Sequence, residues 1–187
     1  MTETDFFPAS FAALGMNEGG YDRNPKDPGN WTAGAIGSGE LRGTKFGVSA
    51  AAYPTVDIAG LTLDQAAAIY RRDYWELLRC PDLVPALAFV LFDAGVNSGV
   101  KRAACWLQAA AGLTGEQVDG IVGPATISAT TAALARIGLG ELLADMQARR
   151  LMFLVGLPTW RTFGLGWARR VTRGPMQGLA IQYGDQK

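Results

Sequence analysis

The stretch "PALAFVLFDAGVNSG", residues 85–99, decides the fold class expected for this chain. It begins with proline, ends with glycine and is apolar on every side, which is typical of a helix buried at the centre of a helical protein. Asp93 and Asn97 are four residues apart and share one face of that helix. A buried carboxylate needs a partner. Because Asn97 also lies at the predicted helix exit, a structural role is favoured here over a role beside a cleft.

Apolar periodicity predicts further helices on both sides of this central one. A capping-box pair, Thr62 and Gln65, precedes a helix in which Ile69, Tyr70 and Leu77 share a face. The later helices are expected at residues 100–112, 124–138 and 140–156, with a short one at about 166–171 and a weakly periodic tail. Residues 22–47 are rich in Gly, Pro, Asn and Asp, and predict turns with a small irregular hairpin. The expected fold is therefore mainly α, with one long loop region that suggests a functional wall or lid.

Glu18 is the first candidate for catalysis. Phe11, Leu14 and Glu18 lie on one stripe of a predicted first helix, and Gly19 and Gly20 are expected to end that helix. A carboxyl group held on the apolar side of a helix end loses hydration, which raises its pKa toward the range of a general acid. The alternative is a solvated glutamate at a helix terminus, although a negative charge there opposes the helix dipole.

Composition narrows the possible chemistry. The 187 residues contain 17 basic and 17 acidic side chains and no histidine, so neither a nucleic-acid partner nor a histidine-based hydrolase or zinc site is expected. Hydrolysis would then depend on carboxylates, without a cofactor or metal. Asp27, nine residues after Glu18, supplies the second carboxylate that glycoside hydrolysis requires, or it simply starts a turn in "KDPG". Thr44 follows in the same loop, where its hydroxyl either holds a water molecule or bonds to nearby backbone.

The remaining candidates concern binding and packing. Tyr21, Trp31 and Asn97 are candidate substrate-binding residues, and the two aromatic rings either stack on sugars or cover the core. Trp75 and Trp106 lie at helical spacing and are expected in the core. Cys80 and Cys105 lie outside any CxxC pattern, which favours reduced thiols over a disulfide. The N-terminus lacks the pattern of a secretory signal, and no apolar run is long enough for a membrane span.

An ordered set of motifs runs along nearly the whole chain. It comprises "EGGY" (18–21), "DPG" (27–29), "GTKFGVS" (43–49), "AAAIYRRDYW" (66–75), "DAGVNSG" (93–99), "WLQ" (106–108) and "DGIVGPAT" (119–126). On these residues the chain resembles the glycoside hydrolase family 108 N-acetylmuramidases, the lysozyme-like proteins of phages, prophages and related particles. The resemblance extends from about residue 8 to about residue 172.

The resemblance implies a lysozyme-like helical fold and cleavage of the β-1,4 bond between N-acetylmuramic acid and N-acetylglucosamine. It implies that Glu18 is the catalytic acid, and that Asp27 and Thr44 complete the set as in phage-type lysozymes. An inverting outcome would require carboxyl groups about 6.5 to 9.5 Å apart. The stretch "NWTAGAIGSGELR", residues 30–42, is inserted between "DPG" and "GTKFG" where many relatives run directly on, which leaves Glu40 as a rival second carboxylate.

Domain organisation and partners follow from the same resemblance. We expect a single lysozyme-like domain over residues 1–187, with a catalytic part at about 1–98 and a helical part at about 99–175 that is similar to a predicted peptidoglycan-binding segment, where Asp119 and Thr126 are candidate wall contacts. The expected partner is bacterial peptidoglycan, reached by a monomer from the cytoplasm through a holin or on a delivery particle. A lytic transglycosylase and a non-catalytic wall-binding or particle-structural protein with the same fold are the alternatives.

Overall fold

The computed structural model describes residues 5–15 and 20–184, and its chain packs into two compact units. Residues 11–71 form one, called here the loop unit. Residues 72–187, together with the chain up to residue 10, form the other, called the helical unit. Each unit is described by itself below. The division of the chain into a catalytic and a C-terminal part near residue 98 stays a prediction.

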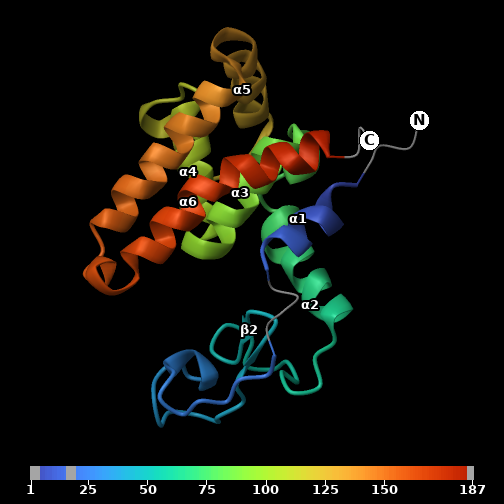
Figure 1. The fold of residues 1–187 in the computed structure, drawn as a ribbon, viewed down its shortest axis with the longest axis vertical. Helices are drawn as coiled ribbons and strands as arrows, with labels where there is room; N and C mark the ends of the chain where they lie inside the picture. The colour runs from blue at the N-terminus through green and yellow to red at the C-terminus, as the bar shows by residue number, and fades with distance from the viewer. Residues whose placement is uncertain (1–4, 16–19, 185–187) are drawn as a thin grey trace. The chain divides into compact units, whose positions relative to one another are not determined.

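The helical unit is built around α3, Pro85–Ser98, whose residues from Ala86 to Gly95 are all buried. Against it lie α4 (Val100–Ala110), α5 (Pro124–Val155) and α6 (Trp160–Tyr183), as Figure 1 shows. Short turns of other helix types occur at Arg71–Trp75, Cys80–Asp82 and Gly115–Gln117. The prediction of a buried central helix in a mainly α fold is therefore confirmed.

Two glycines allow α6 to approach its neighbours closely, Gly178 toward α3 and Gly174 toward α5. A methyl group added to Gly178 would lie 2.6 Å from the carbonyl oxygen of Ala86, and one added to Gly174 would lie 2.9 Å from Nε2 of Gln147. The Ala86 amide donates to Oε1 of Gln182 at 3.2 Å, which ties α3 and α6 at the same level. Side chains at these two positions would force the helices apart.

The length of α6 corrects the sequence prediction. A short helix near residues 166–171 and a weakly periodic tail were expected, but α6 runs for 24 residues, Trp160–Tyr183. Its buried face includes Gly164, Gly174 and Gly178, which contribute little to an apolar pattern. Tertiary packing on α3 stabilises this helix where its own periodicity is weak.

Gly138 interrupts α5. Its φ of 78° and ψ of 165° are not helical, so the element consists of two segments that meet where the sequence predicted a boundary. By length and composition, α5 is the one helix in the described part of the chain that is apolar enough to cross a membrane. The break leaves the segments 124–137 and 139–155, and each is shorter than the roughly 20 residues that a bilayer requires. The second segment also carries the buried Arg150.

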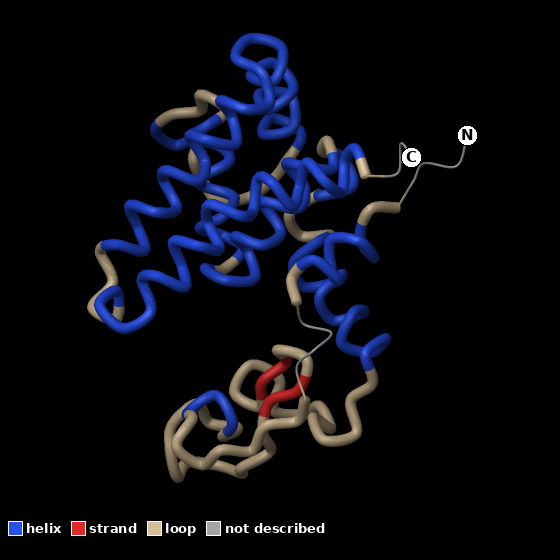
Figure 2. The backbone as a smooth tube through the Cα atoms, viewed as in Figure 1, coloured by secondary structure: helices blue, strands red, loops and turns tan. Residues whose placement is uncertain are grey.

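The loop unit has little regular structure, as Figure 2 shows. It contains the short turn η2 (Pro28–Asn30), an antiparallel hairpin of β1 (Thr44–Lys45) and β2 (Val48–Ser49), and α2 (Leu63–Tyr70). The predicted capping box that starts α2 is present. The structure thus confirms a long Gly-rich loop region with a small hairpin.

Two predictions about helices were wrong, one about length and one about register. The first helix, α1, spans only Phe7–Ala13 and does not continue toward Glu18, because Gly15 takes a left-handed φ of 75° just after it. Beyond α2 the chain adopts a π-helical turn, which shifts the register of the residues that follow. Leu77 is therefore 59% exposed instead of sharing the buried face of Ile69 and Tyr70.

The predictions that Trp75 and Trp106 lie in the core and that the two cysteines are not paired in a disulfide are confirmed. Trp75 and Trp106 are both buried, and the Trp75 ring meets the ring of Phe92 edge-on at 5.3 Å. Cys80 and Cys105 are free thiols. Burial raises the pKa of the Cys80 thiol well above its ordinary value, so it remains protonated and behaves as a small apolar side chain.

Candidate active site

The inserted stretch of the loop unit, residues 30–42, is an excursion of the chain whose two ends meet at Asn30. The carbonyl oxygen of Asn30 accepts from the amides of Arg42 and Gly43, at 2.9 and 3.0 Å. Inside this closed excursion, Trp31 and Leu41 form an antiparallel bridge. The excursion therefore adds thirteen residues, 30–42, without separating the residues on either side of it.

Thr44 is consequently placed against Asn30. The Thr44 hydroxyl donates to Oδ1 of Asn30 at 2.7 Å, and Nδ2 of Asn30 donates to Oδ2 of Asp22 at 2.9 Å and to the carbonyl of Asn24 at 3.1 Å. Asn30 is fully buried. Asp22 and Thr44 are also paired through both of their backbone hydrogen bonds, each 2.8 Å long. The three side chains form one network, which we call the Asp22–Asn30–Thr44 network.

Gly43 makes this close approach possible. Its φ of 85° lies in the left-handed region that favours glycine. A methyl group at this position would overlap the carbonyl oxygen of Asp22 and would lie 2.6 Å from the ring of Tyr21. The glycine that precedes Thr44 is therefore required both by the backbone angle and by the lack of space.

The network determines what the Thr44 hydroxyl can do. Its proton is used in the bond to Asn30, so toward any other group the oxygen acts as an acceptor. An acceptor of this kind can accept a hydrogen bond from a water molecule and leave the water's lone pairs available for attack. Thr44 is thus suited to orienting water, and less suited to donating a hydrogen bond to a substrate.

Asp27 and Glu40, the rival second carboxylates, are held differently. One oxygen of Asp27 accepts from the Gly29 amide at 2.8 Å and caps the turn η2, while its other oxygen has no partner among the described residues. Glu40 forms an ion pair with Arg42 at 2.7 Å, and Arg42 also donates to the carbonyl of Pro54. Asp27 is exposed and forms no ion pair with a residue that the structure describes, so of these two carboxylates it is the more open to act as a base.

Tyr21 and Trp31, the predicted substrate-binding aromatics, each use their polar group to brace the loop. The Tyr21 hydroxyl donates to the carbonyl of Arg42 at 3.1 Å, and Nε1 of Trp31 donates to the carbonyl of Pro25 at 3.0 Å. Tyr21 is still 43% exposed. Their role toward substrate stays a prediction.

Asn97 lies in the helical unit, within a buried charge cluster. Asp93 accepts from Arg150 and from Arg170, each at 2.6 Å, and Oδ1 of Asn97 accepts from Arg150 at 3.1 Å. Burial lowers the pKa of Arg150, and the adjacent Asp93 carboxylate opposes that shift. These bonds agree with the structural role favoured for Asp93 and also engage the amide oxygen of Asn97.

A second polar network fixes the "DGIVGPAT" loop of the helical unit. The buried Gln108 side chain donates to Asp119 at 2.7 Å and to Thr126 at 3.2 Å, and it accepts from the Gly120 amide at 2.9 Å. The bond from Gln108 is the largest cause that lowers the pKa of Asp119, followed by the bond from the Ile121 amide. Asp119 and Thr126 therefore hold the loop in place, and their contact with the wall stays a prediction.

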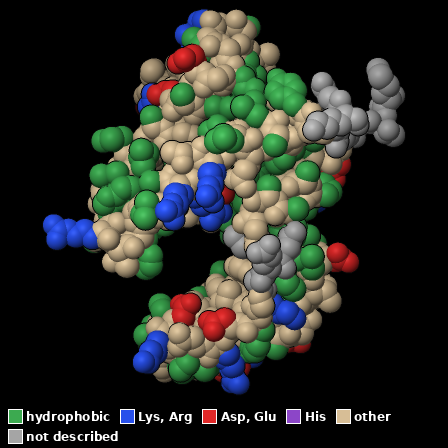
Figure 3. All heavy atoms as spheres, viewed as in Figure 1, with side chains coloured by type: hydrophobic (Ala, Val, Ile, Leu, Met, Phe, Trp, Pro, Cys, Tyr) green, Lys and Arg blue, Asp and Glu red, His purple; other side chains and the backbone are tan. Residues whose placement is uncertain are grey.

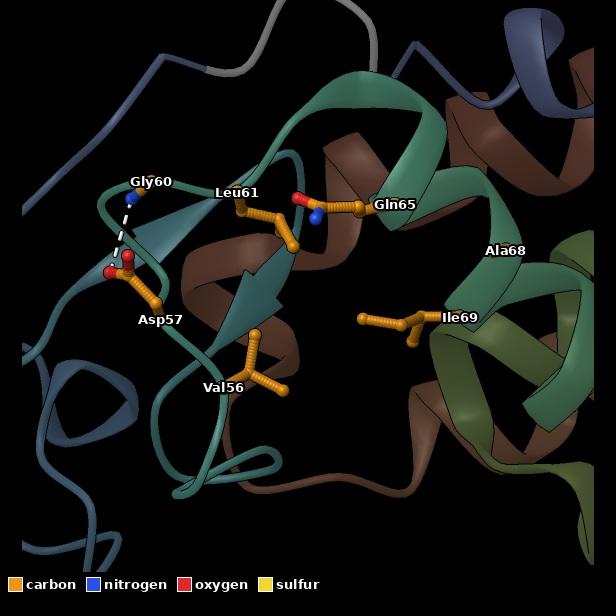
Figure 4. A pocket seen from close by; sticks show the side chains of 7 residues that line it. All are labelled: Val56, Asp57, Gly60, Leu61, Gln65, Ala68 and Ile69. Atoms are coloured by element: carbon orange, nitrogen blue, oxygen red, sulfur yellow. Dashed lines mark hydrogen bonds between the residues drawn. The ribbon is translucent and has the colours of Figure 1, made fainter.

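An apolar pocket of about 340 Å³ lies at the α2 end of the loop unit. Figure 4 shows Val56, Leu61 and Ile69 turned toward a common space. At its edge Asp57 accepts from the Gly60 amide at 3.1 Å. The lining consists of Val56, Asp57, Gly60, Leu61, Gln65, Ala68 and Ile69. None of the predicted catalytic residues that the structure describes belongs to this lining.

Glu18, the predicted acid, lies outside the described residues. Sequence reasoning missed Asp22 and Asn30, which the structure brings together with Thr44. A polar residue directly after "DPG", at the start of the insertion, was the available signal, because a chain excursion must be closed by hydrogen bonds at its base. The structure therefore joins Thr44 to two residues that the motif alone did not indicate.

Comparisons with known proteins agree with this architecture. Residues 11–99 match the family model described as Glycosyl hydrolase 108, and residues 102–172 match the one described as Predicted Peptidoglycan domain. The solved structure of SagA from Brucella abortus is similar, with a TM-score of 0.75 and 28% sequence identity over 97% of this chain and 98% of that chain. No match was found among curated proteins.

The helical fold and the two family matches support a glycoside hydrolase that acts on peptidoglycan. The match to glycosyl hydrolase 108 covers the first part of the chain, residues 11–99, and the second part, residues 102–172, matches the predicted peptidoglycan domain. The mainly α, lysozyme-like fold class expected from the sequence is confirmed by the likeness to SagA.

Proposed function

We propose that this protein is an N-acetylmuramidase that cleaves the β-1,4 bond between N-acetylmuramic acid and N-acetylglucosamine. The observation that carries the proposal is the Asp22–Asn30–Thr44 network, which fixes an acceptor hydroxyl in the matched glycosyl hydrolase region. A hydroxyl held in this way suits the addition of water to a glycosidic carbon. A reaction that forms an anhydro sugar adds no water and has no use for it.

In the proposed mechanism, Glu18 donates a proton to the leaving glycosidic oxygen while positive charge develops on the sugar ring. Thr44 accepts one hydrogen bond from the attacking water. Asp27, through the oxygen that does not cap η2, accepts the second proton of that water and stabilises the charge. The water attacks the anomeric carbon directly, from the face opposite the leaving oxygen, so the outcome is inversion of the anomeric configuration.

Digestion of purified cell walls with product masses tests this proposal. The expected soluble products carry the mass of one added water and a reducing N-acetylmuramic acid end. Products with an anhydro end would instead identify a lytic transglycosylase. Release of glycan fragments with a reducing N-acetylglucosamine end would contradict the proposed bond.

The Glu18→Gln variant separates catalysis from binding. We expect it to release no fragments and still to sediment with insoluble walls. Equal release by the wild type and Glu18→Gln would contradict the role given to Glu18. Wall binding without release by either protein would instead favour a non-catalytic wall-binding protein.

A further inference from the structure

Exposed apolar side chains gather at the turn between α5 and α6 and along α6. Met152, near the end of α5, is 73% exposed, and on α6 Leu165 and Met176 are 67% and 71% exposed. Val155 and Phe163 are exposed beside them. Figure 3 shows hydrophobic side chains over this turn, with Lys and Arg side chains next to them. Large apolar side chains grouped in this way commonly mark an interaction surface.

The charges on the same helix are all positive. Residues 160–183 contain four arginines and no aspartate or glutamate. Arg170 pairs with Asp93, but Arg161, Arg169 and Arg173 are exposed and form no ion pair with any residue that the structure describes. Surface arginines gain stability from acidic neighbours three or four residues away on the same helix, and these three have no such neighbour on α6.

Helical spacing brings the apolar and basic side chains into one stripe. Residues 161, 165, 169 and 173 follow one another at intervals of four and therefore lie on one face, so Leu165 lies between Arg161 and Arg169. Met176, three residues after Arg173, extends the stripe. We call Arg161, Leu165, Arg169, Arg173 and Met176 the outer stripe of α6.

The opposite face of α6 is fixed to the rest of the helical unit. Gly174 and Gly178 lie against Gln147 and Ala86, and Val171 is buried. The outer stripe is therefore presented by a helix that is already folded and packed. Binding through this stripe would therefore not spend free energy on ordering a disordered segment.

We propose that the outer stripe of α6, with Met152 and Val155 at the end of α5, binds the surface of an anionic lipid bilayer. Apolar side chains of a helix that lies in the plane of a membrane enter the boundary between headgroups and acyl chains, while arginines bind the lipid phosphates. The outer stripe has both components and no acidic residue to oppose them. This surface is separate from the proposed catalytic chemistry, and would hold the hydrolase beside the membrane while it acts on the wall.

The side-chain types favour lipid over glycan as the occupant. Leu165, Met176 and Met152 are flexible aliphatic side chains without a flat face on which a sugar ring could stack. The flat rings nearby are partly used in packing on one another, with centroids 6.2 Å apart for Trp160 and Trp167 and 5.8 Å apart for Phe163 and Trp167. Unpaired arginines also match a layer of lipid phosphates, whereas in peptidoglycan the negative charge lies on the stem peptides and the glycan strands themselves are neutral.

Co-sedimentation of the full chain with vesicles tests the proposal. Vesicles of phosphatidylcholine alone are compared with vesicles in which about one third of the lipid is phosphatidylglycerol, and we expect clear binding to the anionic ones only, weakened by added salt. Replacing one arginine, as in Arg169→Gln, should lower the partition coefficient about fivefold. The double variant Leu165→Ser with Met176→Ser should abolish binding while keeping the wild-type melting temperature.

Matched controls come from the same unit. Ile121 is 69% exposed and Arg136 is exposed and unpaired among the described residues, and both lie outside the outer stripe. Ile121→Ser and Arg136→Gln should leave vesicle binding unchanged. The outer-stripe variants should also digest purified, membrane-free walls at the wild-type rate, so that a failure of the proposed muramidase activity remains a separate result.

Three results would overturn the proposal. The first is equal binding to neutral and anionic vesicles or to neither. The second is a loss of binding in the controls as large as in the outer-stripe variants. The third is that the wild type binds no vesicles while the outer-stripe variants lose binding to insoluble walls. That result would identify the outer stripe as a contact for peptidoglycan.

Discussion

The hydroxyl of Thr44 donates to the side-chain oxygen of Asn30 at 2.7 Å, although the two residues are fourteen positions apart. The bond exists because the excursion between them returns to its own starting point, where the Asn30 carbonyl accepts from Arg42 and Gly43. An insertion in this loop therefore leaves Thr44 beside the segment "DPGN", as a short direct connection would.

Removing the Thr44 hydroxyl is expected to reduce catalysis. Thr44→Val keeps the shape of the side chain but no longer orients water, and we expect the rate of wall digestion to fall about a hundredfold. Thr44→Ser retains the hydroxyl and should recover most of that rate. Both variants are to be assayed well below their melting temperatures, because Thr44→Val leaves the Asn30 oxygen without its partner at a cost of about 1–3 kcal/mol. Equal rates for both variants would contradict the role of Thr44.

Gly43→Ala is expected to disturb the same network from the backbone. The added methyl group meets the carbonyl of Asp22 and the ring of Tyr21, and it also strains a φ of 85°. Gly37 has a similar φ of 77° with nothing within 4 Å, so Gly37→Ala reports the backbone strain alone. We expect Gly43→Ala to lower both the melting temperature and the rate of wall digestion further than Gly37→Ala does.

The sequence predicted the elements of this region but not their connections. The turn-rich composition of residues 22–47 and the motif "GTKFG" indicated a loop and a hairpin, and both are present. The partner of Thr44 was not predictable from spacing, because hydrogen bonds between distant loop segments have no periodicity. The first helix was predicted too long for a related reason, since the apolar stripe of Phe11 and Leu14 gives no sign that Gly15 turns left-handed.

The contact between α3 and α6 gives a prediction about stability. Gly178→Ala places a methyl group against the backbone of Ala86 and should lower the free energy of unfolding by about 1–3 kcal/mol. Gly166 lies in the same helix with nothing within 4 Å, so Gly166→Ala should raise that free energy by up to about 1 kcal/mol. Denaturant unfolding of the two variants measures both changes, and the prediction requires them to have opposite signs.

The charge cluster at Asp93 predicts a large loss of stability. Asp93→Asn leaves the buried guanidinium group of Arg150 and the half-buried one of Arg170 without their counter-charge, and should cost about 3–5 kcal/mol. The exposed pair of Asp145 and Arg149 is the control, since Asp145→Asn should change stability by less than about 1 kcal/mol. Similar costs for the two variants would contradict a structural role for the cluster.

Asp119 predicts how stability depends on pH. Its pKa is lowered in the folded state, so its carboxylate contributes stability above the unfolded pKa, near 3.9, and that contribution is lost as the pH falls through the folded pKa. The wild type should therefore melt above Asp119→Asn at about pH 6, and the difference should shrink below about pH 4. A difference that stays constant over this range would assign the effect to packing instead of charge.

Burial in the helical unit was more predictable than in the loop unit. The apolar positions of residues 85–99 and the spacing of Trp75 and Trp106 placed the core correctly, because helix periodicity reports directly on burial. The full length of α6 was not predictable, since glycines that allow two backbones to approach carry no hydrophobic signal. The bond from Arg150 to Asn97 joins residues 53 positions apart, and only the fold brings them together.

Because the excursion is closed at Asn30, the length of this loop can change without a change in the position of Thr44. Doubling the length of a flexible loop costs only about 0.6 kcal/mol in closure entropy. Gly37 has open space around it, and residues 33–40, in the middle of the excursion, are exposed. The excursion is therefore a suitable point for grafting an affinity tag or a targeting peptide. The graft can vary in length while the Thr44 hydroxyl keeps its bond to Asn30.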